Sequence, residues 1–270
     1  MFTLRLLVPT VLVFLSPAVL SQKASRVAPG PFVVADIFAE PDELLMVRTF
    51  GAGTTSQGTH LLGTPVNFLR GVVLDGPDSG WFVSGYSETG GPTGFYRFAN
   101  GQSTLVAPFP LTRWGSLADT SWSRNGDFIW YVWDPSGPQK ETLYTIDLAG
   151  AFTQVGEIRY ANGVALGIAG GIALDRRTGV LYSYDQTTAS LITIDPVTAV
   201  ATRVGPSGLR PYSQIVIMSM DFSNDGRLFM IRNFGNLYEV NLSSGAAVSA
   251  GAVSTACASL AFVPPTPVVR

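Results

Sequence analysis

The sequence predicts an all-β protein, and three observations lead to this expectation. Glycine and proline are plentiful, at 29 and 18 of 270 residues, whereas charged residues make up only 13% of the chain. This balance is typical of many short strands joined by tight turns rather than of helices. Tight polar turns recur along the chain, and similar apolar strands recur at fixed distances from those turns. Together these features predict a repeating β architecture.

Four tight turns can be overlaid, because each ends in a glycine and precedes an apolar strand. They are Asp78-Ser79-Gly80, Arg124-Asn125-Gly126, Arg177-Thr178-Gly179 and Asn224-Asp225-Gly226. Their glycines lie 46, 53 and 47 residues apart. Asn-Gly and Asp-Gly between apolar runs favour hairpins with a type I′ turn, in which both central residues have positive φ.

A further strand of each unit overlays as well. Tyr96, Tyr144, Ile192 and Tyr238 lie 48, 48 and 46 residues apart, and a second turn and a strand of small residues follow each of them. A regular period with four strands in each unit favours propeller blades over a sandwich. We therefore expect a single β-propeller of four-stranded antiparallel blades.

The repeat places four blades at about residues 68–110, 116–158, 165–208 and 215–253. Residues 259–263 resemble the first strand of a blade, whereas the apolar strands at 32–38 and 44–50 lack such a strand. Pairing of these terminal segments gives a composite blade from 30–62 plus 257–265 and closes the ring, which removes exposed sheet edges. We expect five blades, with six as the alternative because residues 51–63 are unassigned.

The first 21 residues have the design of a signal peptide. Arg5 gives a positive start, residues 6–15 are mostly apolar, and residues 16–21 include small residues suited to cleavage. Cleavage near Ser21 leaves one domain, 22–270, which we expect to be secreted (periplasmic or extracellular), monomeric and without a membrane span. An uncleaved anchor is the alternative. The mature chain has 16 basic and 19 acidic residues, which argues against nucleic acid as a partner.

Two stretches, residues 172–194 and 220–240, share a detailed pattern. An apolar-Asp or apolar-Phe-Ser sequence is followed by a turn with glycine, an apolar strand, and a strand such as Leu191-Ile192-Thr193-Ile194-Asp195. In this pattern the chain resembles bacterial secreted β-propeller repeat proteins over about residues 68–253. The resemblance implies an architecture but no activity, because such blades serve binding proteins, lyases, lactonases and structural modules alike.

The rarity of histidine and cysteine limits the enzyme hypotheses. His60 is the only histidine and Cys257 the only cysteine. A Ser-His-Asp triad would need His60, and the chain has no nucleophile-elbow motif. Zinc or iron sites built on several imidazoles are excluded. Cys257 lies in an apolar segment and is expected to be a small buried hydrophobe.

A calcium site made of oxygen ligands is compatible with the sequence. Asp119 and Asp221 are expected at the start of two innermost strands, where neighbouring hydroxyl and amide groups could complete an oxygen cage for Ca²⁺. The alternative is that each aspartate caps a loop or bonds the neighbouring blade. No other cofactor is predicted.

The links between successive blades pair arginine with an aromatic residue three times. These pairs are Arg113 with Trp114, Arg159 with Tyr160, and Arg210 with Tyr212. If the links surround one mouth of the channel, with Trp122 nearby, they form a funnel for a carbohydrate, an anionic small molecule or a protein. The alternative is that each arginine stacks on an aromatic ring to seal one blade against the next.

The sequence thus favours a secreted ligand-binding or interaction module with a funnel on one face, and it leans against an enzyme. The first alternative is a metal-dependent lactonase or lyase of the propeller type, which would use carboxylates such as Asp119 and Asp221. The second alternative is a structural protein of the cell envelope.

Overall fold

A computed structural model describes residues 30–36, 43–47, 69–84, 94–108, 119–133, 141–210, 217–253 and 257–264. These residues form twenty β-strands and contain no helix, so the expected all-β class is confirmed. Accordingly, no helix within these ranges could span a membrane. The proposed signal peptide and His60 lie outside the described residues.

Two consecutive four-stranded antiparallel sheets come first after the N-terminal segment. The first consists of β3 (Leu69–Gly76), β4 (Ser79–Ser84), β5 (Gly94–Ala99) and β6 (Gln102–Pro108). The second consists of β7 (Asp119–Trp122), β8 (Phe128–Trp133), β9 (Thr142–Asp147) and β10 (Phe152–Glu157). In both, strands adjacent in sequence are adjacent in space.

Two further sheets follow the same plan. One consists of β12 (Ala169–Asp175), β13 (Val180–Asp185), β14 (Ser190–Ile194) and β15 (Val200–Pro206), to which β11 (Arg159–Tyr160) adds a short parallel strand beside β15. The other consists of β16 (Ile217–Phe222), β17 (Leu228–Arg232), β18 (Asn236–Val240) and β19 (Ala247–Ala252). The short strand β11 was not expected.

A three-stranded sheet joins segments from both ends of the chain. It consists of β2 (Glu43–Val47), β1 (Phe32–Asp36) and β20 (Cys257–Phe262), in that order. Strand β20 pairs antiparallel with β1, with Phe32 opposite Phe262 and Ala35 opposite Ser259. Cys257 is fully buried, as expected.

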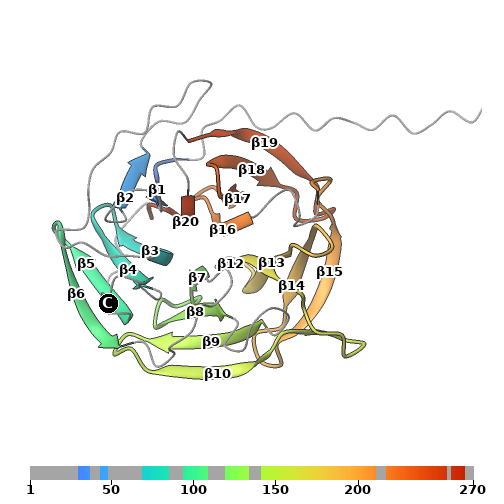
Figure 1. The fold of residues 1–270 in the computed structure, drawn as a ribbon, viewed down its shortest axis with the longest axis horizontal. Helices are drawn as coiled ribbons and strands as arrows, with labels where there is room; N and C mark the ends of the chain where they lie inside the picture. The colour runs from blue at the N-terminus through green and yellow to red at the C-terminus, as the bar shows by residue number, and fades with distance from the viewer. Residues whose placement is uncertain are drawn as a thin grey trace, which may run out of the picture.

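The sheets are arranged like the blades of a propeller (Figure 1). In the four-stranded blades the first strand is innermost and the last lies at the rim, and in the three-stranded sheet β20 is innermost. The innermost strands contact one another in turn: β3 contacts β7, β7 contacts β12, β12 contacts β16, β16 contacts β20, and β20 contacts β3. Apolar side chains alternate between the two faces of each strand, so each sheet packs against both neighbours. Phe82, for example, is 1% exposed and stacks on Tyr96 with ring centroids 4.9 Å apart.

The turns between the first and second strands differ from the expected type I′. At the Asn125-Gly126 and Asp225-Gly226 turns only the glycines have positive φ, at 75° and 81°. The Gly126 N–H donates to the Ser123 carbonyl (3.2 Å), which closes a four-residue turn in which Gly126, the fourth residue, alone has positive φ. The expectation is wrong here, whereas Asn100 and Gly101, between β5 and β6, both have positive φ.

Candidate functional site

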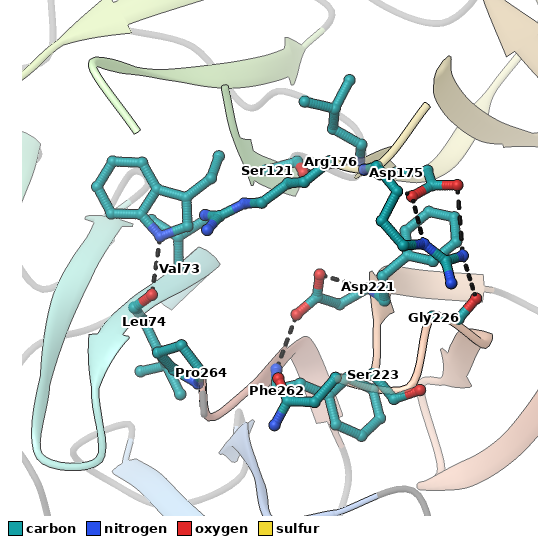
Figure 2. A pocket seen from close by; sticks show the side chains of 15 residues that line it. Val73, Leu74, Ser121, Asp175, Arg176, Asp221, Ser223, Gly226, Phe262 and Pro264 are labelled. Carbon is teal, nitrogen blue, oxygen red and sulfur yellow. Dashed lines mark hydrogen bonds and ion pairs between the residues drawn. The ribbon is translucent and has the colours of Figure 1, made fainter. Parts of the chain in front are cut away.

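The C-terminal ends of β3, β7, β12, β16 and β20 line one cavity of about 200 Å³. Its lining residues come from the strand ends and from the turns that follow them: Val73, Leu74, Ser121, Trp122, Leu174, Asp175, Arg176, Arg177, Asp221, Phe222, Ser223, Asn224, Gly226, Phe262 and Pro264. Each of these strands contributes its C-terminal end rather than its N-terminal end. The strands therefore run in the same direction beside one another. Figure 2 shows this cavity from close by.

Asp221 lies at the centre of the cavity lining, as the next-to-last residue of β16. Its Oδ1 accepts the N–H of Phe222 (2.8 Å) and its Oδ2 accepts the N–H of Phe262 in β20 (2.7 Å). Ser121, the next-to-last residue of β7, does the same for the neighbouring blade, because its Oγ accepts the N–H of Leu174 (2.9 Å). Asp221 is therefore a charged version of a structural acceptor between blades.

The environment of Asp221 disfavours its ionised form. Burial raises the pKa of Asp221 to about 6, against the lowering effects of the two backbone N–H groups and of the Arg176 charge. The desolvation effect is the largest of these because the apolar walls replace water around the carboxylate. A fraction of Asp221 is thus protonated close to neutral pH.

Arg176 brings a positive charge to the same cavity. It directly follows β12, and its side chain extends across the cavity, toward which the Asp221 carboxylate also points (Figure 2). The Arg176 guanidinium carbon lies 5.9 Å from the centroid of the Trp122 ring. The Trp122 indole N–H donates to the Leu74 carbonyl (2.8 Å), which fixes the ring as one wall. A cation above an aromatic face is an attractive arrangement.

Two more arginines are held beside the cavity by bonds between successive turns. Arg177 pairs with Asp175 (3.1 Å), and its Nη2 donates to the Gly226 carbonyl of the next blade (2.9 Å). Arg124 Nη2 in turn donates to the Arg177 carbonyl (3.3 Å). Arg176 and Arg177 therefore both line the cavity, and Arg124 lies on the neighbouring turn beside Arg177.

Of the six residues predicted to form a funnel, three lie within the described structure. Arg113, Trp114 and Tyr212 lie outside the described residues. Arg159 and Tyr160 form β11, at the edge of the sheet opposite to the innermost strand β12. Arg159 pairs with Glu157, and the Tyr160 hydroxyl donates to Asp185 (2.6 Å), which together with burial raises the pKa of Tyr160. Arg210 is exposed at the end of a described segment. The funnel stays a prediction.

The two aspartates predicted as metal ligands lie at different ends of their strands. Asp119 is the first residue of β7, as expected, but Asp221 is near the end of β16 rather than at its start. The side chain of Asp119 lies outside the described part of the structure. In the described part of the chain no three His, Cys, Asp or Glu side chains form a group that could hold a metal ion. The hydrogen bond from Asp221 to the next blade agrees with the structural alternative stated for it.

Sequence reasoning missed Arg176 as a cavity residue and assigned Trp122 to the predicted funnel rather than to this cavity. Arg176 and Arg177 form an arginine pair in a polar turn, and such a turn has the same composition as a hairpin turn exposed to solvent. The one available signal was that Arg176 directly follows an innermost strand, the position from which a side chain can turn back over the strand ends.

The chain matches no protein-family model and no curated protein sequence. Among solved structures it is similar to a chain of a nidogen/laminin complex (12% identity, TM-score 0.52, covering 86% of this chain and 98% of that one). It is also similar to TolB from Acinetobacter baumannii (14% identity, TM-score 0.51, 87% and 67%). These likenesses show the β-propeller fold alone and agree with the architectural resemblance in the sequence.

A third similar structure is a protein of unknown function from Bacteroides thetaiotaomicron, with 14% identity and a TM-score of 0.47. The match covers 81% of this chain and 49% of that protein, so the chain spans about half its length.

Proposed function

We propose that this protein is an exported β-propeller of five blades that binds a small polar ligand. Support for export is the N-terminal pattern at residues 1–21. Support for five blades in a closed ring is the pairing of β1 with β20, together with the contacts that β20 makes with both β16 and β3. In this proposal the sheet of β1, β2 and β20 is the composite fifth blade.

The ligand site in this proposal is the cavity at the C-terminal ends of the innermost strands. The observation that carries it is the joint presence of Arg176 and Asp221 in one concave space with aromatic walls. A concave, mostly apolar site with a few convergent polar groups, one of them with a shifted pKa, is the usual form of a small-molecule site.

Binding is favoured over metal-dependent catalysis by the bonds of Asp221. Each of its carboxylate oxygens already accepts a backbone N–H, and one of these bonds joins two blades. A carboxylate that accepts these two structural hydrogen bonds fixes the position of the cavity wall and of the negative charge on it. The predicted funnel of Arg113, Trp114, Arg159, Tyr160, Arg210 and Tyr212 would be a second, separate surface.

The proposal is tested by thermal-shift and calorimetric screening with small anions, cations and neutral polyols, followed by a variant that fills the cavity mouth. Asn224 is exposed and lines the cavity, and its side chain makes one bond, to the Val263 carbonyl (2.8 Å). We expect Asn224→Tyr to weaken binding of any compound found by at least tenfold. Asn162→Tyr is the matched control, because Asn162 is an exposed asparagine of a distant turn with one backbone bond (3.1 Å).

Two results would overturn the proposed site: a compound that binds Asn224→Tyr as well as the unsubstituted protein, or the absence of binding by every class of compound. Equal weakening of binding by both variants would also count against the cavity. The loss of affinity would then come from adding a tyrosine to the protein rather than from its position at the cavity.

A further inference from the structure

We propose that the ligand of this cavity is a small carboxylate with a single apolar ring, held through its carboxylate by Arg176 and through its ring by the aromatic walls. The inference rests on the proposed binding function and deepens it by naming the chemical class of the ligand. It follows from the charge of Arg176, from the state of Asp221, and from the size and walls of the cavity.

One arginine of the cavity lining, Arg176, favours an anion. Arg124, Arg176 and Arg177 come from two successive turns, and backbone carbonyls of the following turns hold Arg124 and Arg177 in place. Of the acidic lining residues, Asp175 is already paired with Arg177 (3.1 Å). The nearby Asp225 is paired with Arg227 (2.8 Å). Because Asp175 and Arg177 offset each other, a ligand carboxylate in the cavity meets the guanidinium group of Arg176, whose planar N–H fork matches its two oxygens.

Asp221 does not make the cavity a site for cations. Its two oxygens point at the N–H groups of Phe222 and Phe262, and burial disfavours its charge, whereas arginine stays charged at every pH relevant to proteins. Of the other strand positions that line the cavity only Asp175 is charged, and it is paired with Arg177. Because the two backbone N–H groups already bond its oxygens, Asp221 opposes an anion less than an unbonded carboxylate would, and this opposition weakens further as the pH falls toward 6.

The space suits one ring. An apolar cavity of about 150 Å³ is large enough for benzene, so about 200 Å³ accommodates a ring and one small polar group. Trp122, Phe222, Phe262 and Leu174 supply apolar surface on several sides. Aromatic walls favour a flat ring, because ring pairs gain energy beyond their buried area. Arg176, near the Trp122 face, lies where the carboxylate of such a ligand would project.

Three compounds that share a phenyl ring and differ in charge test the ligand class: benzoate, benzamide and benzylammonium, titrated at pH 7 by calorimetry. We expect benzoate to bind and benzamide to bind at least tenfold more weakly. Benzylammonium is expected not to bind measurably. Tighter binding of benzylammonium than of benzoate would overturn the inference, as would the failure of all three compounds.

Arg176→Gln tests the residue assignment. It should weaken benzoate by at least tenfold and leave benzamide unchanged, whereas Arg176→Lys, which keeps the charge but loses the fork, should have an intermediate effect. Arg203→Gln is the control, because Arg203 is an exposed arginine on β15 outside the cavity. Equal benzoate affinity in Arg176→Gln and Arg203→Gln would overturn the assignment.

These outcomes separate the two proposals. If the three ring compounds fail but another compound binds and is sensitive to Asn224→Tyr, the ligand class is wrong and the binding site stands. If no compound of any class binds, both proposals fail.

Discussion

The two ends of the innermost strands use the same device in different surroundings. At the N-terminal ends, Glu141 Oε1 accepts the N–H of Ala169, the first residue of β12 (3.2 Å), and Gln186 Oε1 accepts that of Ile217, the first residue of β16 (3.0 Å). At the C-terminal ends, Ser121 and Asp221 accept N–H groups from the next innermost strand. In all four cases a side-chain acceptor joins successive blades.

The difference lies in what surrounds the acceptors. Glu141 and Gln186 are fully buried, whereas Ser121 and Asp221 line a cavity that also holds Arg176. A buried acceptor can only stabilise the frame, because no ligand reaches it. An acceptor at a cavity stabilises the frame and also sets the charge that a ligand meets. The comparison shows how one structural position acquires a chemical role through its exposure.

The substitution Asp221→Ser should have the largest effect, which is a change in how the free energy of unfolding depends on pH. Burial raises the pKa of Asp221 from 3.8 to about 6, so between these values the folded protein binds more protons than the unfolded chain. This group should contribute about 3 kcal/mol of stability at low pH, and most of that contribution should be lost as the pH rises from 4 to 7. Serine keeps an acceptor at this position, as Ser121 does, but cannot ionise.

The free energy of unfolding, measured by urea denaturation at pH 4, 5, 6 and 7, checks this expectation. The difference between Asp221→Ser and the unsubstituted protein should shift in favour of the variant as the pH rises. A constant difference across this range would show that Asp221 has an ordinary pKa. The C-terminal ends of the innermost strands would then not differ from the N-terminal ends in their electrostatics.

Gln186→Leu should have the next largest effect. It leaves the buried N–H of Ile217 without its acceptor, which costs about 2 kcal/mol of unfolding free energy. Ser121→Ala makes the matching change at the other end and should cost about 1 kcal/mol, because water in the cavity can replace the lost acceptor. Urea denaturation measures both. A larger cost for Ser121→Ala than for Gln186→Leu would contradict the conclusion that the C-terminal ends of the innermost strands border a cavity whereas the acceptors at the N-terminal ends are buried.

Much of the fold could be predicted from the sequence because its signals are local. Turn glycines such as Gly126 and Gly226 and the alternating apolar strands are visible within a few residues, and they lead to four-stranded antiparallel blades. Residues 259–263 could be assigned to a first strand for the same reason. The turn type at Asn125-Gly126 was mistaken, because the Ser123 carbonyl sets it and the dipeptide alone does not.

The candidate site could not be predicted to the same extent, because it depends on distant partners. Asp221 is bonded to Phe262, 41 residues away, and Trp122 is fixed by Leu74, 48 residues away. Arg159 and Tyr160 resemble a blade-to-blade link in sequence, yet their pairing with Val200 and Ala201 puts them beside the outer strand β15. No local pattern distinguishes these placements.

The most direct test of the central claim follows four backbone N–H signals by NMR during titration with benzoate. Phe222 and Phe262 donate to Asp221 at the cavity, whereas Ala169 and Ile217 donate to Glu141 and Gln186 at the closed end. The signals of Phe222 and Phe262 should shift with a single saturating curve while those of Ala169 and Ile217 stay in place. Shifts confined to Ala169 and Ile217 would contradict the claim that ligands bind at the C-terminal ends of the innermost strands.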